Sequence, residues 1–160
     1  MLTSTETDKV WQEMYAAEVC AMYFGDLTVT YSKRKQFLTG VSFFLSSGAA
    51  ASVIGKAPAW VPVVTASISA LATAYSIAVG LDRKATTMAK LQIQWSQIAS
   101  DLERLWNHWY DDDAEATLLE IQRRMREASQ LGSMEAPNDE KRMDKWAVRN
   151  AKLHRMEIPA

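Results

Sequence analysis

The chain has 160 residues and a formal net charge of −1 at pH 7, which is the size of one ordinary domain. This charge balance excludes a global field that would attract nucleic acid or an acidic surface, so any such attraction must be local. The single cysteine, Cys20, excludes an intramolecular disulfide, and its helical surroundings predict a small buried hydrophobe. The 48% apolar content resembles that of a soluble protein, but such an average conceals membrane spans, which are local features.

The first predicted element is a cytoplasmic amphipathic helix from about residue 6 to about residue 30, within an N-terminal region of residues 1–35. The beginning of the sequence lacks the basic and apolar regions of a secretory signal peptide. Apolar residues then recur at alternating steps of four and three, which is the pattern of one buried helix face. These residues are Val10, Met14, Ala17, Ala21 and Phe24.

Two uncharged runs follow, at residues 36–55 and 57–81, and only Lys56 separates them. Because about 20 apolar residues cross a hydrocarbon core of about 30 Å, each run is long enough to span a bilayer. The sequence therefore predicts a transmembrane hairpin over residues 36–81. Its tight turn would lie at residues 55–58, with Lys56 as the exterior polar tip and Pro58 in the first turn of the second helix. A buried hairpin in a soluble helical bundle is the alternative.

Charged residues at the two ends of the hairpin predict its orientation. Cations directly before the first run and directly after the second are typical of cytoplasmic ends under the positive-inside rule. Both termini are therefore predicted to be cytoplasmic, and Tyr31 and Trp60 are predicted to lie at the membrane interfaces. The cations are Lys33, Arg34, Lys35, Arg83 and Lys84.

Small and hydroxylated residues interrupt both runs at helical spacing. Gly48 and Ser52 form a small-xxx-small pair, which favours close helix packing in a membrane. The hydroxyls form one stripe on each helix; they either bond back to carbonyls one turn earlier or line a weakly polar pore. The stripes are Thr39, Ser42 and Ser46 on the first run, and Thr65, Ser69, Thr73 and Ser76 on the second.

A heptad helix is predicted over residues 82–110, directly after the hairpin. Its apolar residues alternate steps of three and four without a break, which requires a packing partner. The partner is either the N-terminal helix of the same chain or the same helix in a neighbouring copy. The stripe consists of Met88, Leu91, Trp95, Ile98, Leu102, Leu105 and Trp109.

Residues 111–160 are predicted to form further cytoplasmic helices. Three aspartates, residues 111–113, are predicted to cap a helix that ends at Gly132, and a last helix is predicted from about Asp139. The apolar face of the first helix comprises Leu118, Ile121, Met125 and Ala128. The last helix carries cations that either contact a partner or form an ordinary solvated face. The partner would be anionic lipid or nucleic acid. The candidate contact residues are Lys141, Arg142, Lys145 and Arg149.

Motifs for enzymatic chemistry are missing from the sequence. There is no nucleophile triad, no phosphate-binding glycine loop and no Cys/His cluster, and His108 with Asp112 is too sparse to predict a metal site. Neither span contains an acidic ring, so any pore is expected to be poorly selective. We therefore predict an all-α membrane protein without catalytic residues, metal or cofactor.

The order of elements resembles the SLATT family of bacterial two-transmembrane effectors over roughly residues 6–110. The resemblance consists of the N-terminal stretch YAAEVCAMYF, the basic lead-in YSKRK, the hairpin and the heptad helix. It implies a homo-oligomeric, multi-pass effector in the bacterial inner membrane that depolarises the cell in anti-phage defence by abortive infection. It also implies a sensor encoded nearby, such as a nucleotidyltransferase system or a retron-type reverse transcriptase with its nucleic acid.

Two other classes of protein fit the same pattern. A membrane adaptor would use the hairpin as an anchor and the heptad helix to recruit a soluble partner, without conducting ions. A holin-like lysis protein also pairs small-residue spans with charged ends, but more than half of this chain lies outside the predicted spans. Ion leakage on expression would distinguish an adaptor from a pore.

Overall fold

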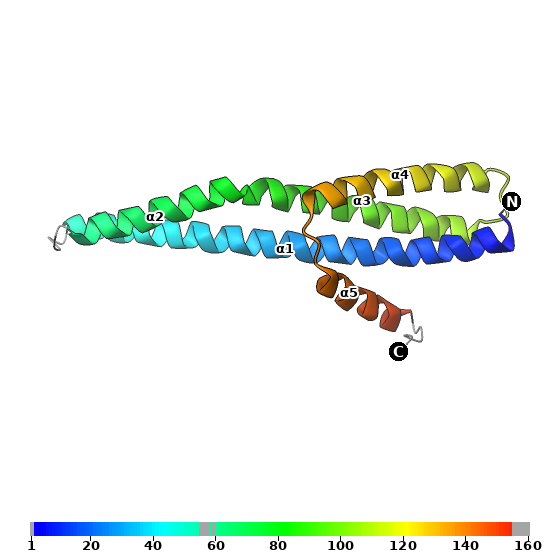
Figure 1. The fold of residues 1–160 in the computed structure, drawn as a ribbon, viewed down its shortest axis with the longest axis horizontal. Coiled ribbons are helices and arrows are strands. Elements are labelled where there is room, and N and C mark those ends of the chain that lie inside the picture. Colours follow the sequence, from blue (N-terminus) through cyan, green and yellow to red (C-terminus); the bar gives the residue numbers. More distant parts are fainter. Residues whose placement is uncertain (1, 55–57, 59, 155–160) are drawn as a thin grey trace. The chain divides into compact units, whose positions relative to one another are not determined.

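The structure is a computed structural model that describes residues 2–54, 58 and 60–154. These residues form five α-helices and no strand (Figure 1), which confirms the predicted all-α class. The chain divides into two compact units: unit 1 comprises Met1–Leu27 with Thr87–Ala160, and unit 2 comprises Thr28–Thr86. The helices are α1 (Ser4–Ile54), α2 (Trp60–Val79), α3 (Leu81–Asn107), α4 (Ala114–Glu135) and α5 (Glu140–Leu153).

Helix α1 begins at a capping box formed by Thr3 and Glu6. The backbone N–H of Thr3 donates to the Glu6 carboxylate at 2.7 Å, and the N–H of Glu6 donates to the Thr3 hydroxyl at 3.3 Å. Hydrogen bonds from Thr3, chiefly from its backbone N–H, lower the pKa of the Glu6 carboxyl. The T-x-x-E spacing is a sequence signal for this helix start. The first apolar stripe begins at Val10, four residues after Glu6.

The core of unit 1 is built around the heptad stripe of α3. Ile98 and Leu102, in the middle of the stripe, are completely or almost completely buried within this single chain. The packing partner of the stripe is therefore the same chain, which was one of the two alternatives. Trp109 differs from the rest, because α3 ends at Asn107 and the Trp109 side chain is 40% exposed. The buried members are Met88, Leu91, Trp95, Ile98, Leu102 and Leu105.

The N-terminal part of α1 is buried on more than the one predicted face. Val10, Met14, Ala17 and Phe24 of the predicted stripe are buried, whereas Ala21 is half-buried. Other positions of the helix are covered as well, because α5 docks on it through hydrogen bonds. The sequence pattern did not reveal this second face, whose buried residues are Val19, Tyr23 and Leu27.

Helix α4 packs in unit 1 through the predicted residues Leu118, Ile121 and Ala128, with Met125 half-buried. Its predicted end at Gly132 is wrong, since the helix continues to Glu135. Gly132 is buried, and a Cβ added to it would lie 3.1 Å from the Phe24 ring. The glycine therefore permits a close approach of helices instead of ending one.

The N-terminal ends of α4 and α5 can be compared with the predicted caps. Asp113 occupies the N-cap position of α4, but its side chain makes no capping hydrogen bond. Asp139 does cap α5, as its carboxylate accepts the backbone N–H of Arg142 at 3.1 Å. The predicted start of the last helix at about Asp139 is thus confirmed, whereas Asp113 does not cap α4 through its side chain.

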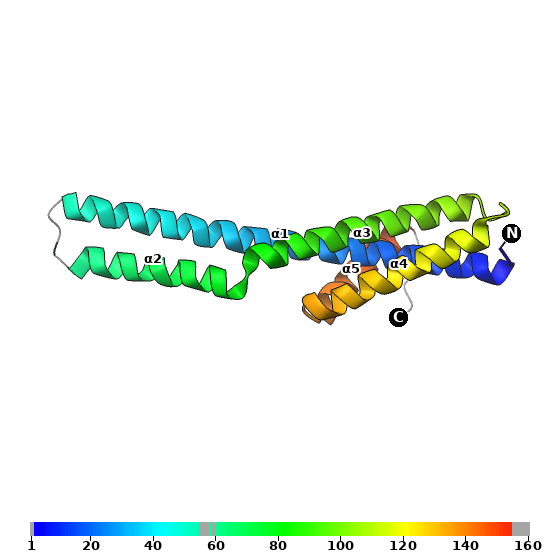
Figure 2. The ribbon, with the colours of Figure 1, turned by 90° about the horizontal axis from the view of Figure 1, so that it is seen from above.

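In unit 2, α2 lies beside the second half of α1 and runs in the opposite direction (Figure 2). Pro62 lies in the first turn of α2, where a missing N–H costs little, and the carbonyl of Pro58 accepts the N–H of Val61. Helix α2 ends at Val79, and Gly80 takes a left-handed φ of 61° before α3 begins. The predicted turn at residues 55–58, including Lys56, lies outside the described residues except for Pro58.

Candidate membrane-inserted hairpin

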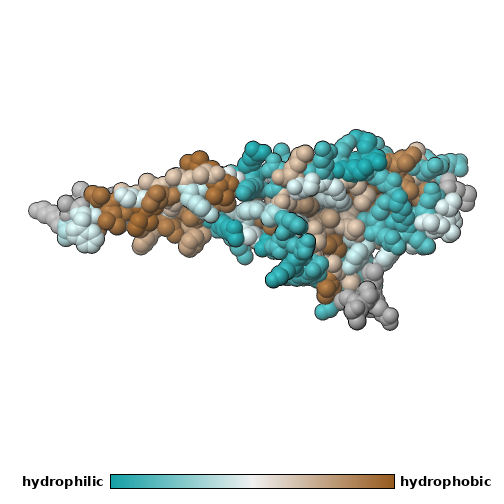
Figure 3. Space-filling model, viewed as in Figure 1, coloured by the Kyte–Doolittle hydropathy of each residue, from teal (hydrophilic) through white to brown (hydrophobic). Residues whose placement is uncertain are grey.

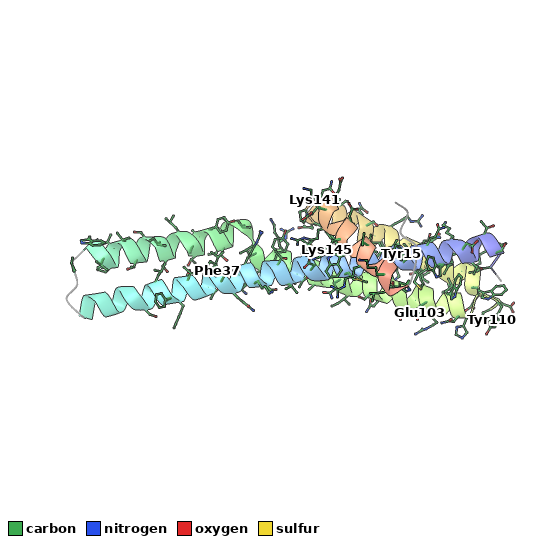
Figure 4. All side chains as sticks on the ribbon, turned by 90° about the horizontal axis from the view of Figure 1, so that it is seen from below. Tyr15, Phe37, Glu103, Tyr110, Lys141 and Lys145 are labelled. Atoms are coloured by element: carbon green, nitrogen blue, oxygen red, sulfur yellow. The ribbon has the colours of Figure 1, made fainter. Side chains whose placement is uncertain are left out.

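The candidate functional site is unit 2, whose large apolar side chains lie on its surface. Leu71, for example, is 71% exposed on α2, and Phe37 projects from α1 (Figure 4). Figure 3 shows hydrophobic residues along this face of the hairpin. Exposing so much apolar surface to water is unfavourable. Contiguous apolar surface of this kind therefore marks a contact with a membrane or with another protein. The most exposed members are Phe37, Phe43, Phe44, Trp60, Val63, Leu71 and Ile77.

One helical segment among the described residues, Trp60–Asn107, is long and apolar enough to cross a membrane. Its most apolar window of 18 residues has a mean hydropathy of 1.6, and only 6% of that window is buried. A core helix of a soluble protein would instead be mostly buried. The described residues thus contain one candidate membrane span, which includes α2, and the predicted crossing by two spans is not confirmed.

Hydroxyl groups connect α1 and α2 in the middle of the hairpin. The Ser69 hydroxyl lies 2.9 Å from the Ser46 hydroxyl and donates to the carbonyl of Ser42 at 3.1 Å. The Thr73 hydroxyl contacts the Ser42 hydroxyl at 3.4 Å. Ser69 is only 9% exposed. Four of the predicted pore-lining residues therefore form an interhelical cluster, which we call the hydroxyl cluster: Ser42, Ser46, Ser69 and Thr73.

The hydroxyl cluster shows the first of the two alternatives that the sequence left open, which is bonding back to carbonyls one turn earlier. The Ser46 hydroxyl also donates to the Ser42 carbonyl of its own helix at 2.7 Å, and Thr73 donates to the Ser69 carbonyl at 3.0 Å. These hydroxyls therefore bond back along each helix and across to the other helix. In an apolar environment such bonds between helices satisfy polar groups that have no water to bind.

The other predicted hydroxyls and small residues lie outside the hydroxyl cluster. Thr65 bonds back to the carbonyls of Val61 and Pro62, Thr39 is exposed, and Ser76 is half-buried. A Cβ added to Gly48 would meet no atom within 4 Å, so this glycine leaves an open surface on α1. The side chain of Ser52 lies outside the described part of the chain.

An ion pair joins α1 to the first turn of α3, at the end of the hairpin opposite the predicted turn. The Lys35 ammonium lies 2.5 Å from the Asp82 carboxylate, and both side chains are exposed. Sequence reasoning counted Lys35 only as an orienting cation. An antiparallel hairpin brings the residue before its first run beside the residue after its second, so the pair could have been predicted from the boundaries of the runs.

In unit 1, a cavity of about 480 Å³ is lined by Cys20, Tyr23, Phe24, Trp95 and Met143, among others. Cys20 is half-buried, and its burial raises the pKa of the thiol to about 11. The thiol is therefore protonated at neutral pH and a weak nucleophile. No group of three potential metal ligands from His, Cys, Asp and Glu occurs among the described residues.

The cations of α5 separate into an inward and an outward set. Arg142 faces α1, where its guanidinium lies 3.6 Å from the carboxylate of Asp26 and 3.4 Å from that of Asp139. Arg142 is therefore engaged within unit 1, in contrast with its predicted role as a partner contact. Lys141, Lys145 and Arg149 are exposed, as predicted for a contact surface or a solvated face.

The comparisons with known proteins add no family to these observations. Comparison of the chain with protein-family models, with curated protein sequences and with solved structures finds no match.

Proposed function

We propose that the protein is an oligomeric membrane effector whose hairpin crosses the bacterial inner membrane twice and opens a poorly selective pore. The observation that carries the proposal is the exposed apolar surface of unit 2, because a helix with only 6% of its most apolar window buried needs lipid or further protein around it. The resemblance to SLATT effectors supports a role in anti-phage defence with a separate sensor as the trigger.

Assembly into an oligomer is part of the proposal, since two helices do not enclose a water-filled path. Small residues on α1 support such assembly: Gly40 and Gly48 lie on one side of the helix, and a Cβ on either would meet nothing within 4 Å. Open glycine surfaces permit close approach of helices from neighbouring copies in a membrane. The pore would then form between hairpins, with the hydroxyl stripes rotating toward the path on opening.

A non-conducting membrane adaptor is the second candidate, and one observation favours it. The hydroxyls of Ser42, Ser46 and Ser69 bond within one hairpin, which leaves them fewer free donors for water in a pore. An adaptor needs only this closed hairpin as an anchor and unit 1 as the soluble part. Ion conduction decides between the two candidates.

Replacing Ser69 by Leu is expected to abolish depolarisation without preventing membrane insertion. Leucine adds volume and removes a hydroxyl in the hydroxyl cluster, and it enters a bilayer more readily than serine does. The measurement is the membrane potential of cells that express the protein together with its neighbouring genes and are triggered by phage. The expected loss is at least tenfold in the fraction of depolarised cells, at equal amounts of membrane-bound protein.

Ser67→Leu is the matched control, because Ser67 is an exposed residue of the same helix whose hydroxyl bonds back to the Val63 carbonyl. It is expected to depolarise as the wild type does. If Ser69→Leu also depolarised normally, the conduction path would lie elsewhere. If the wild type never depolarised the membrane beside its sensor, the adaptor would be the correct function.

A further inference from the structure

The outward face of α5 carries a row of four exposed cations. They are Lys141, Lys145, Arg149 and Lys152, all exposed, and none of them forms an ion pair among the described residues. At 3.6 residues per turn they occupy about 80° of the helix circumference and extend over roughly 16 Å. We call this surface the cation row; Lys141 and Lys145 are labelled on α5 in Figure 4.

The opposite face of α5 is fixed to α1, which keeps the cation row turned outward. Asn150 donates to the Glu18 carboxylate at 2.8 Å, and the Tyr15 hydroxyl donates to the Ala147 carbonyl at 2.6 Å. His154 contacts the same Glu18 oxygen at 2.7 Å. On the helix, Asn150 lies roughly opposite Lys141. The docked helix therefore presents its cations as one preformed surface.

The side chains around the cation row favour a lipid surface over nucleic acid. Trp146 is the aromatic residue of α5, but Lys145 and Arg149 lie over its ring at 5.1 and 5.0 Å, and its indole N–H donates to Asp26 at 3.4 Å. The ring is thus occupied, whereas single-stranded nucleic acid binds to free aromatic faces.

Exposed aliphatic side chains complete the surface. Val148 lies among the cations and is 40% exposed, and Leu153 at the end of the helix is 66% exposed. A helix that combines a row of Lys and Arg with exposed aliphatic residues is suited to the interface of an anionic bilayer. We propose that the cation row of α5 binds the anionic lipid headgroups of the membrane. This inference rests on the proposed membrane location of the protein.

The test uses the full-length protein with Cys20→Ser and an environment-sensitive fluorophore on Val148→Cys. The protein is reconstituted into vesicles of phosphatidylcholine alone or with added phosphatidylglycerol, each containing a headgroup-level quencher lipid. We expect stronger quenching with phosphatidylglycerol and its loss at high salt, because each cation strengthens the attraction by about fivefold. Replacing Lys141, Lys145, Arg149 and Lys152 by Glu is expected to remove the difference between the two vesicles.

Asp144→Lys is the matched control, because it adds an exposed cation beside the row and is expected to increase the quenching. Far-UV circular dichroism shows whether each variant keeps the helical content of the wild type. Equal quenching in both vesicles, or no effect of charge reversal, would overturn the proposal. The proposal would also be overturned if the fluorescence changed on adding an oligonucleotide to phosphatidylcholine vesicles but did not change with phosphatidylglycerol.

Flotation of the vesicles separates this inference from the proposed function. A hairpin that inserts makes the protein float with both kinds of vesicle. Should the hairpin fail to insert, binding by α5 alone would make the protein float only with phosphatidylglycerol, which supports the cation row while contradicting the transmembrane hairpin. Flotation with neither kind of vesicle contradicts both.

Discussion

Replacing Ile98 and Leu102 together by Asp is expected to unfold unit 1. The two side chains are 1% and 0% exposed in the middle of α3, where the contacts come from the same chain. Burying one unpaired carboxylate costs roughly 4 kcal/mol or more, so two of them remove about as much free energy as a whole domain's stability of about 5–15 kcal/mol. Tryptophan fluorescence of the purified protein measures the loss, because Trp95 lies in this core.

Ile93→Asp is the matched control for this variant. Ile93 lies on the same helix but is 57% exposed, so the same new charge there is expected to change the free energy of unfolding by less than about 0.5 kcal/mol. A double variant that kept a wild-type emission spectrum and resistance to protease would show that the stripe is not the core. A variant that stayed folded but lost its oligomeric size would assign the stripe to contacts between copies.

Replacing Leu71 by Asp is expected to prevent or greatly weaken insertion of the hairpin. Leu71 is 71% exposed, so the substitution would cost almost nothing if water surrounded it. Near the centre of a membrane helix, an Asp in place of a Leu costs about 3–4 kcal/mol, which is a factor of more than a hundred in the insertion equilibrium. The measurement is the fraction of the protein that stays with membranes after extraction at alkaline pH.

The exposed residue Ile93 in unit 1 again provides the control, because Ile93→Asp is expected to leave membrane extraction unchanged. Loss of Leu71→Asp from the membrane fraction, with Ile93→Asp retained, is the result that a lipid-facing α2 requires. Equal retention of both variants would mean that the exposed apolar face of α2 contacts water or another protein.

The regular apolar patterns of the sequence predicted much of the fold. The stripe from Met88 to Leu105 and the start of α5 at Asp139 follow from helix periodicity and capping chemistry, which are local properties. Gly132 was misread as a helix end, because a glycine that ends a helix and one that admits a neighbouring ring look alike in sequence. Only the contact with Phe24 distinguishes them.

The sequence predicted which hydroxyl residues share a helix face in the candidate site, but it did not predict the hydrogen bonds between the two helices. Helical spacing places Ser42 and Ser46 on one face and Ser69 and Thr73 on another, but it does not give the rotation of the two helices about their axes. That rotation decides whether the hydroxyls meet each other, as they do at 2.9 Å between Ser46 and Ser69. The inward turn of Arg142 escaped prediction for the same reason, since it depends on how α5 docks on α1.

Cysteine accessibility in intact cells tests most directly whether the hairpin crosses the membrane twice. In a Cys20→Ser background, Lys56→Cys is compared with Lys141→Cys by labelling with a maleimide that does not cross membranes. The account predicts that the cysteine at position 56 reacts in intact cells and that the one at position 141 reacts only after the inner membrane is permeabilised. If position 56 were labelled only after permeabilisation, or if position 141 were labelled in intact cells, the two-span orientation would be wrong.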